Sequence, residues 1–288
     1  MPAASSPRHN SHSSSWAESS LIFARKRFGQ HFLHDRGVLE RIVREIAPTA
    51  DQALLEIGPG RGALTEMLLG KSRTLDAIEI DRDLAQQLRA RWGAPQGFEI
   101  HEADALDFDL ATLARTRGAR LRVIGNLPYN ISTPLLFHIA AAHEHIDDVH
   151  VMLQKEVIDR IAAAPGSGEY GRLTVMLAPW FEAKHLFDVG PGAFTPAPRV
   201  WSAVARLRVR REPAFEVPPA FARTVSAAFS QRRKTLRNAL RAVFHEPAVD
   251  EALALTGIDG VRRGETLDIA EFGQLAACLP ATAAIPTL

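Results

Sequence analysis

The segment Glu56-Ile57-Gly58-Pro59-Gly60-Arg61-Gly62 constrains the fold more than any other part of this 288-residue chain. It follows a short apolar run, residues 53–57, and precedes a segment with apolar residues at helical spacing. Glycines are needed where a backbone turns sharply and lies close to a ligand, because a Cβ atom would obstruct both. The segment therefore predicts a strand–turn–helix unit of a doubly wound α/β sheet, with a ligand at the turn.

Short apolar runs alternate with helical patterns over the first half of the chain. Strands are expected at residues 53–57, 75–80, 98–101, 121–125 and 149–153, with spacers long enough for crossover helices. Such alternation predicts parallel strands with helices on both faces. Two later runs, residues 173–177 and 201–209, are expected to form an antiparallel hairpin that closes one edge of the sheet.

Proline-rich breaks at residues 212–219 separate this pattern from a helical one, in which Phe221, Val225 and Phe229 recur at four-residue spacing. We expect an α/β domain over residues 21–211 and a small helical domain over residues 212–288. Residues 1–20 are rich in Ser, Ala, Pro and His and lack an apolar stretch, which favours a disordered leader over a secretory signal.

The single cysteine, Cys278, excludes a disulfide framework and a four-cysteine metal site, which fits a reducing compartment. No run of 18 apolar residues is present, so a soluble, cytoplasmic protein is expected. The histidines show no ligand spacing that indicates a metal.

Positive charge is concentrated in one part of the chain. Residues 199–241 contain eleven Lys or Arg and two acids, a net charge of +9, whereas the rest of the chain carries −8. A second cluster, Arg25-Lys26-Arg27, follows the leader. This segregation predicts a surface that binds a polyanion, and the alternative is a solvated helix face.

Acidic residues distinguish among the ligands that such a turn can bind. Glu79 ends the second expected strand, 21 residues after Gly58, where a carboxylate can accept ribose hydroxyls. Asp104 follows the third strand, where it can accept a hydrogen bond from an adenine amino group. Glu56 would repel a pyrophosphate but suits a sulfonium that carries an α-amino group. The acids therefore favour S-adenosylmethionine over NAD or FAD, and they disfavour an NAD-dependent oxidoreductase.

The fourth expected strand ends in Asn126-Leu127-Pro128-Tyr129, at the sheet edge where ligands bind. An adenine amino nitrogen is a poor nucleophile because its lone pair is delocalised. If the Asn126 side-chain oxygen and the Leu127 or Pro128 carbonyl accept its two hydrogens, the lone pair can turn toward a methyl sulfonium. Pro128 would hold the loop, and Tyr129 would stack on an extruded base.

Two other interpretations of this loop have less support. An asparagine at a strand end is commonly a turn former, but four such residues at the position that the cofactor motif predicts favour chemistry. Methylation of a cytosine ring needs a cysteine nucleophile, and Cys278 lies in the expected helical domain.

Four ordered motifs, at residues 24–33, 56–60, 126–132 and 194–200, resemble those of the ribosomal RNA adenine dimethylases, most of all the bacterial small-subunit (KsgA/RsmA) type. The resemblance covers nearly the whole chain from about residue 21. It implies a Rossmann-like class I S-adenosylmethionine methyltransferase sheet with a small C-terminal helical domain. It also implies dimethylation of two adjacent adenosines in a hairpin near the 3′ end of 16S rRNA, late in assembly of the small ribosomal subunit.

The resemblance also assigns residues to the cofactor. His31 and Leu33 would lie in an N-terminal loop that closes on S-adenosylmethionine, although the family often has Asn in place of His31. Gly58 would line the methionine end, Glu79 would bind the ribose and Asp104 the adenine. Asn126 would contact both the cofactor and the reacting amine.

On the RNA side, Phe194 would stack on the target base opposite Tyr129, and its alternative role is core packing. The basic residues expected to bind RNA are Arg25, Lys26, Arg27, Arg232, Arg233 and Lys234. The ordered segment 231–238 favours the small-subunit enzyme over the antibiotic-resistance adenine methylase of large-subunit rRNA. An assembly factor for which methylation is secondary stays open.

Overall fold

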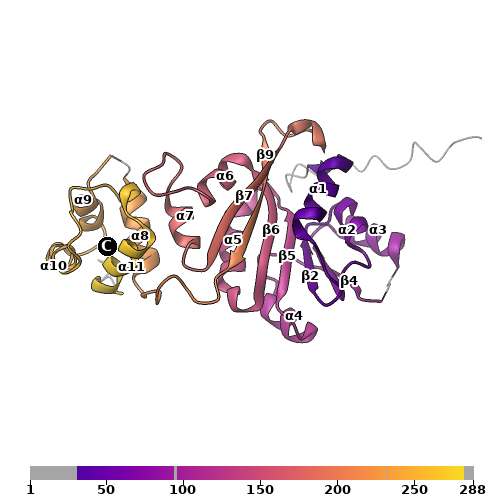
Figure 1. The fold of residues 1–288 in the computed structure, drawn as a ribbon, viewed down its shortest axis with the longest axis horizontal. Coiled ribbons are helices and arrows are strands. Elements are labelled where there is room, and N and C mark those ends of the chain that lie inside the picture. The colour runs from indigo at the N-terminus through magenta and orange to yellow at the C-terminus, as the bar shows by residue number, and fades with distance from the viewer. Residues whose placement is uncertain (1–30, 94–95, 232, 282–288) are drawn as a thin grey trace, which may run out of the picture.

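The computed structural model describes residues 31–93, 96–231 and 233–281, and it contains a seven-stranded sheet in the order β4-β3-β2-β5-β6-β9-β7 (Figure 1). The neighbours from β4 to β6 pair in parallel, whereas β9 pairs antiparallel with both β6 and β7. The expected α/β sheet is confirmed. Its strands are β2 (Ala53–Ile57), β3 (Thr74–Glu79), β4 (Phe98–Glu102), β5 (Leu121–Asn126), β6 (Ile146–Gln154), β7 (Phe181–Val189) and β9 (Ser202–Val209).

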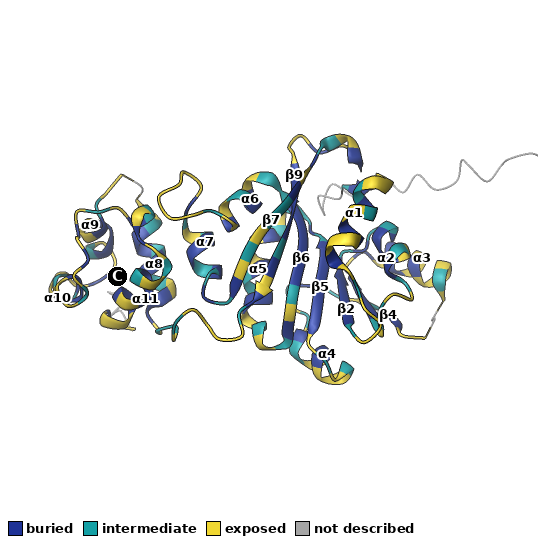
Figure 2. Cartoon of the chain, in the orientation of Figure 1, coloured by how far each residue is buried: buried dark blue, intermediate teal, exposed yellow. Residues whose placement is uncertain are grey.

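Helices cover both faces of this sheet, as the fully buried strand β2 requires. On one face, Leu39 and Leu64 share a core with Leu54 of β2. On the other face, Leu113 shares a core with Leu55. The central strands are accordingly buried along most of their length (Figure 2). The helices of this part are α1 (Arg36–Ile46), α2 (Ala63–Leu68), α3 (Arg82–Trp92), α4 (Leu110–Arg117), α5 (Ser132–Ala141) and α6 (Lys155–Ile161).

Several helices begin at an aspartate that caps the first turn. The carboxylates of Asp35, Asp81 and Asp109 accept hydrogen bonds from backbone N–H groups at the starts of α1, α3 and α4. These N–H groups have no partner within a helix, so each cap stabilises its helix by about 1 kcal/mol. Asp81 lies two residues after the end of β3, and the cap therefore also holds the chain near the end of that strand.

The edge of the sheet differs from the prediction for residues 173–177. They lie in helix α7 (Arg172–Leu177), and the strand that pairs with β9 at the edge is β7. In so short a segment, the alternation of Leu173, Val175 and Leu177 does not distinguish a strand from a buried helix. The alternation within β7 is interrupted by a register shift between His185 and Phe187. The other expected strand, residues 201–209, is confirmed as β9.

Four helices follow the sheet and lie together at one end of the molecule (Figure 1). Their core contains Phe221, Leu240 and Phe272, and also Tyr170 and Val175 from the region before β7. Contacts therefore cross the expected boundary between residues 211 and 212, and the division into two domains stays a prediction. The helices are α8 (Phe221–Ser230), α9 (Leu236–Arg241), α10 (Glu246–Thr256) and α11 (Ile269–Cys278).

A two-stranded antiparallel sheet joins the start of the described chain to the β7–β9 connection. It consists of β1 (Phe32–Leu33) and β8 (Phe194–Thr195). The Ala193 carbonyl also accepts a hydrogen bond from the His34 backbone, at 2.9 Å, so this connection lies beside the start of α1 (Figure 1). Within the described residues, every helix is too short or too polar to cross a bilayer. The expected leader, residues 1–20, lies outside the described residues.

Candidate functional site

A cavity of about 170 Å³ opens where the parallel strands end, at the sheet edge at which ligands bind in such folds. Many of the residues predicted from the sequence line it, although they come from segments far apart in the chain. They are His31, Leu33, Gly58, Glu79, Asp104, Asn126, Leu127, Pro128 and Tyr129. The predicted cofactor and catalytic residues therefore share one cavity.

The backbone requires a glycine at two positions that line this cavity. Gly58 has a φ of +68°, which L side chains rarely adopt, and its N–H donates to the Ile78 carbonyl at 2.9 Å. At Gly125, a Cβ atom would come within 2.6 Å of the Ile57 carbonyl oxygen. The sequence motifs indicate no role for Gly125, because only the close approach of β5 to β2 shows that a side chain cannot fit there.

Glu79 is buried, and backbone N–H groups hold its carboxylate. One oxygen accepts a hydrogen bond from Gly60 at 3.0 Å, and the other accepts one from Asp81 at 2.9 Å. Burial raises the pKa of Glu79, although these hydrogen bonds oppose the rise. Each carboxylate oxygen can accept more than one hydrogen bond, so the group keeps capacity for ligand hydroxyls.

Glu56 lies deeper in the same wall. The Thr65 hydroxyl donates to its carboxylate at 2.6 Å, and the side chain is almost fully buried. Burial raises the pKa of Glu56 to about 7, with the Thr65 hydrogen bond opposing the rise. Glu56 was expected to disfavour a pyrophosphate and to suit a sulfonium ligand. The structure makes it a cavity residue that changes its charge near neutral pH.

Asp104 follows β4, the strand next to β3, and also lines the cavity with one oxygen engaged. Its Oδ1 accepts a hydrogen bond from the Leu106 N–H at 2.9 Å, which orients the carboxylate after β4. Among the described residues, no hydrogen bond to Oδ2 is present. This leaves an acceptor on the cavity wall that can receive a ligand amino group.

The Asn126 amide is held from the N-terminal segment. Its Nδ2 donates to the His31 carbonyl at 3.0 Å, so the acceptor Oδ1 is the remaining polar atom. The Pro128 carbonyl already accepts a hydrogen bond from Ile131 at 3.2 Å, whereas none reaches the Leu127 carbonyl from the described residues. The Leu127 side chain is buried in the core. The sequence allowed either the Leu127 or the Pro128 carbonyl as the second acceptor. Of the two, only the Leu127 carbonyl accepts no hydrogen bond from a described residue.

Tyr129 is half-buried beside this loop, and contacts at both ends hold it. Its hydroxyl hydrogen-bonds Ser202 at 2.7 Å, and its ring stacks on that of His31, with 5.6 Å between centroids. His31 Nδ1 in turn lies 2.8 Å from the Pro196 carbonyl. Burial raises the pKa of the Tyr129 hydroxyl, so it stays protonated at neutral pH. No sequence motif indicates a role for Ser202, a serine within a strand.

Phe194 lies in the core. It pairs with Leu33 in the small sheet, is only 3% exposed, and is not among the residues that line the cavity. This position matches the core-packing alternative. Stacking on a base would require the ring to leave the core, so that role stays a prediction.

The basic residues divide into paired and exposed groups. Arg210 pairs with Glu182 at 2.9 Å, and Arg241 pairs with Asp250 at 2.6 Å, so part of the charge counted along residues 199–241 is neutralised internally. Arg233 and Lys234 are exposed, without an ion pair to any described residue. The remaining predicted RNA-binding residues lie outside the described residues: Arg25, Lys26, Arg27 and Arg232.

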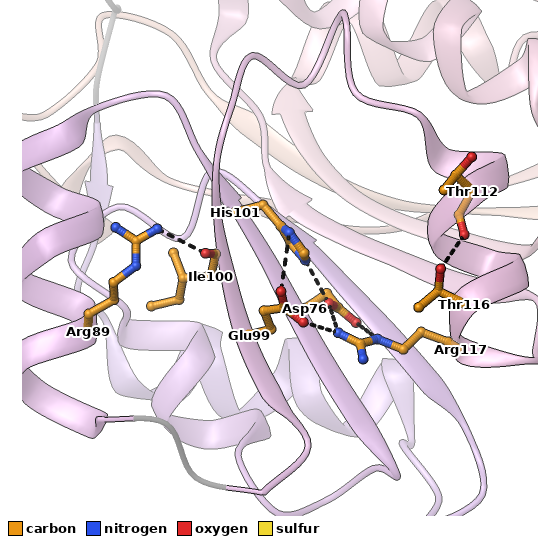
Figure 3. Close-up of polar contacts among 8 residues, drawn as sticks. All are labelled: Asp76, Arg89, Glu99, Ile100, His101, Thr112, Thr116 and Arg117. Atoms are coloured by element: carbon orange, nitrogen blue, oxygen red, sulfur yellow. Dashed lines mark hydrogen bonds and ion pairs between the residues drawn. The ribbon is translucent and has the colours of Figure 1, made fainter.

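Away from the cavity, Asp76, Glu99 and His101 bring three possible ligand atoms together. The guanidinium of Arg117 already binds two of them, lying 2.9 Å from Asp76 and 2.6 Å from Glu99 (Figure 3). Burial raises the pKa of Asp76, but hydrogen bonds from His101 and Arg117 outweigh it and lower the value overall. An arginine among the carboxylates makes this an ion-pair network that joins β3, β4 and α4.

A family model described as ribosomal RNA adenine dimethylase matches residues 23–279. The chain is 51% identical to ribosomal RNA small subunit methyltransferase A of Pseudomonas aeruginosa over 255 residues, which cover 88% of this chain and 93% of that protein. It is 52% identical to the protein of the same name from Methylococcus capsulatus, with 86% and 95% covered.

Solved structures show the same fold. The 23S rRNA methyltransferase ErmE matches with a TM-score of 0.65 and 28% identity, covering 86% of this chain and 99% of that one. A dimethyladenosine transferase from Plasmodium falciparum matches with a TM-score of 0.70 and 24% identity, covering 85% and 96%. The matched family model, the identities of about half and the Rossmann-like sheet agree: this chain belongs to the ribosomal RNA adenine dimethylase family.

Proposed function

We propose that this chain transfers methyl groups from S-adenosylmethionine to the exocyclic amino groups of two adjacent adenosines, in a hairpin near the 3′ end of 16S rRNA in the small ribosomal subunit. One observation carries the proposal: the Asn126 amide is oriented by His31 and lies next to the unengaged Leu127 carbonyl, in a cavity that Glu79 and Asp104 also line.

This arrangement suits an amine that is a weak nucleophile. Asn126 Oδ1 accepts one amino hydrogen and the Leu127 carbonyl accepts the other, which turns the nitrogen lone pair toward the methyl donor. Because both acceptors are held by the fold, little reorganisation is needed during the reaction. The hydrogen bond from Asn126 to the His31 backbone keeps the amide from rotating. His31 thus acts on Asn126 through its carbonyl, whichever side chain it carries.

The cavity fits the cofactor by the chemistry of its walls. Gly58 leaves room for the methionine end, the remaining lone pairs of Glu79 accept ribose hydroxyls, and Asp104 Oδ2 accepts the adenine amino group. Leu33 supplies an apolar contact from β1. When bound, the cofactor supplies a methyl group on a sulfonium, whose positive charge suits the neighbouring Glu56.

On the RNA side, the target base stacks on Tyr129, whose hydroxyl is fixed by Ser202. Arg233 and Lys234 bind backbone phosphates. The relatives that are about half identical to this chain are named as small-subunit methyltransferases, which favours the small subunit. ErmE, which is named as a 23S rRNA methyltransferase, is only 28% identical to this chain. The substrate form would be a late assembly intermediate in the cytoplasm, and the helical region after residue 211 would bind it.

The test uses labelled S-adenosylmethionine and small subunits that lack these methyl groups, followed by mapping of the labelled nucleotides. We expect label on two adjacent adenosines near the 3′ end of 16S rRNA, with both hydrogens of each amino group replaced. Label on large-subunit RNA, or on no adenine, would overturn the proposal. Parallel reactions with assembly intermediates and mature subunits establish which form is the better substrate.

A further inference from the structure

Trp201 is exposed in a way that the other described tryptophans are not. It is 56% exposed and belongs to none of the hydrophobic clusters. Trp92, by contrast, packs edge-on against Phe98, and Trp180 stacks on His143. A large aromatic side chain left in water does not contribute the stabilisation that its burial would bring. Such a side chain therefore marks a binding contact more often than a structural one.

The backbone around Trp201 is nevertheless held firmly. Its carbonyl accepts a hydrogen bond from the Lys155 N–H at 2.9 Å, and the next residue, Ser202, pairs with Val189 of β7. The ring lies over Gly190, where an added Cβ would contact it at 3.7 Å. A fixed ring with an exposed surface loses little conformational entropy when a planar group stacks on it.

Trp201 belongs to a loop whose two ends contact residues that line the cavity. Ser202 hydrogen-bonds the hydroxyl of Tyr129, and Pro196, at the other end of the same loop, hydrogen-bonds His31. Both Tyr129 and His31 line the cavity. A group bound on Trp201 would therefore lie at the rim of the site where the target base is proposed to bind.

The charges near Trp201 suit an anionic partner. Arg199, two residues away, is exposed and forms no ion pair with a described residue. Asp188, on the strand that pairs with β9, is paired with Lys155 at 3.3 Å and lies 2.9 Å from His185, which leaves Glu156, the residue after Lys155, as the exposed acid of this region. An aromatic face beside an unpaired cation is the combination that binds unpaired nucleotides, by stacking on the base and attracting the phosphate.

We propose that Trp201 is the platform on which the nucleobase next to the target adenosine stacks, with Arg199 binding an adjoining phosphate. The inference rests on the proposed function, in which two adjacent adenosines are methylated. When one adenosine occupies the cavity, its neighbour is tethered by a single phosphodiester and must lie at the rim. Trp201 thereby positions the substrate without touching the reacting atoms.

The test compares three variants in steady-state methyl transfer to undermethylated small subunits. We expect Trp201→Ala to raise KM for the subunit about tenfold, with kcat and cofactor affinity within about twofold of the unmodified protein. Trp201→Phe keeps an aromatic face and should restore most of the affinity. Val200→Ala, which removes an exposed apolar side chain from the same loop, is the matched control and should leave KM within about twofold.

The outcomes separate this proposal from the proposed function. An inactive unmodified protein would refute the function, whereas an active protein with an unchanged KM in Trp201→Ala would overturn the platform alone. Equal losses in Trp201→Ala and Trp201→Phe would also overturn it, because a stacking contact tolerates Phe.

Acylation of ribose 2′-hydroxyls in enzyme-bound subunits then distinguishes an RNA partner from a protein partner. With S-adenosylhomocysteine present to prevent turnover, we expect the nucleotide beside the target to be protected by the unmodified protein and exposed with Trp201→Ala. Equal protection by both proteins would mean that Trp201 contacts another part of the subunit, and the proposal would be wrong.

Discussion

The cavity at the strand ends and the basic stretch of residues 199–241 both contain polar groups, but the fold uses them in opposite ways. In the cavity, Glu79 and Asn126 are held by backbone groups, and each keeps an acceptor for a ligand. In the basic stretch, Arg241 is paired with Asp250, whereas Arg233 is exposed and forms no ion pair with a described residue. The cavity therefore offers few, fixed contacts, whereas the basic surface offers several that solvent screens.

This difference has a consequence for function. In a buried site, the loss of a single fixed polar group has a large effect on binding or catalysis, because water cannot replace that group. Exposed cations act weakly and additively, and their effect depends on salt. Substitutions in the two regions should differ in size, in the kinetic constant that changes and in their response to ionic strength.

The largest effect is expected for Asn126→Ala. Removing one of the two acceptors for the amino hydrogens should lower kcat roughly 100- to 1000-fold, by analogy with the loss of one transition-state hydrogen bond. Cofactor affinity, measured by calorimetry, should stay within about threefold. Gln86→Ala, at an exposed amide side chain of α3, is the control and should retain full activity. If Asn126→Ala abolishes cofactor binding, Asn126 belongs to the cofactor site instead.

A smaller effect is expected from the protonation of Glu56. Its pKa of about 7 means that the carboxylate predominates above neutral pH, and a cationic sulfonium ligand should prefer that form. Affinity for S-adenosylmethionine should therefore rise about tenfold between pH 6 and pH 8, as the ionised fraction rises. Binding titrations across this range test the prediction. Glu56→Gln should flatten the profile, and a profile that persists in that variant would assign the titration to another group.

The smallest effect is expected on the basic surface. Arg233→Glu combined with Lys234→Glu should weaken binding to the subunit several-fold. The slope of log affinity against log salt concentration should become about 1.5 less steep, and the free energy of unfolding should stay unchanged. Arg241→Ala should behave differently, lowering the free energy of unfolding by less than about 1 kcal/mol, because its charge is already paired. A salt slope that both variants leave intact would mean that Arg233 and Lys234 form only a solvated face.

Much of the sheet could be predicted because each buried strand is a short apolar run bounded by glycine or charge. The strand expected at residues 53–57 has the same bounds in the structure. The strand predicted at residues 173–177 was wrong, because a buried six-residue helix and a buried strand have similar apolar sequences. The strand β7 was missed because it lies at the edge of the sheet, where exposed Glu182 and a register shift obscure its alternation.

The sequence by itself determined the strand–glycine–helix turn, the acids after successive strands and the loop from Asn126 to Tyr129. These are local patterns, in which each residue type is required by the geometry or chemistry of its own segment. Only the tertiary structure decided that His31 holds Asn126, that Ser202 holds Tyr129 and that Asp250 neutralises Arg241. His31 and Asn126 are 95 residues apart and Ser202 and Tyr129 are 73 apart, so neither pair leaves a trace in the local pattern. Which polar groups a protein leaves available to a ligand depends on which ones the folded chain has already satisfied.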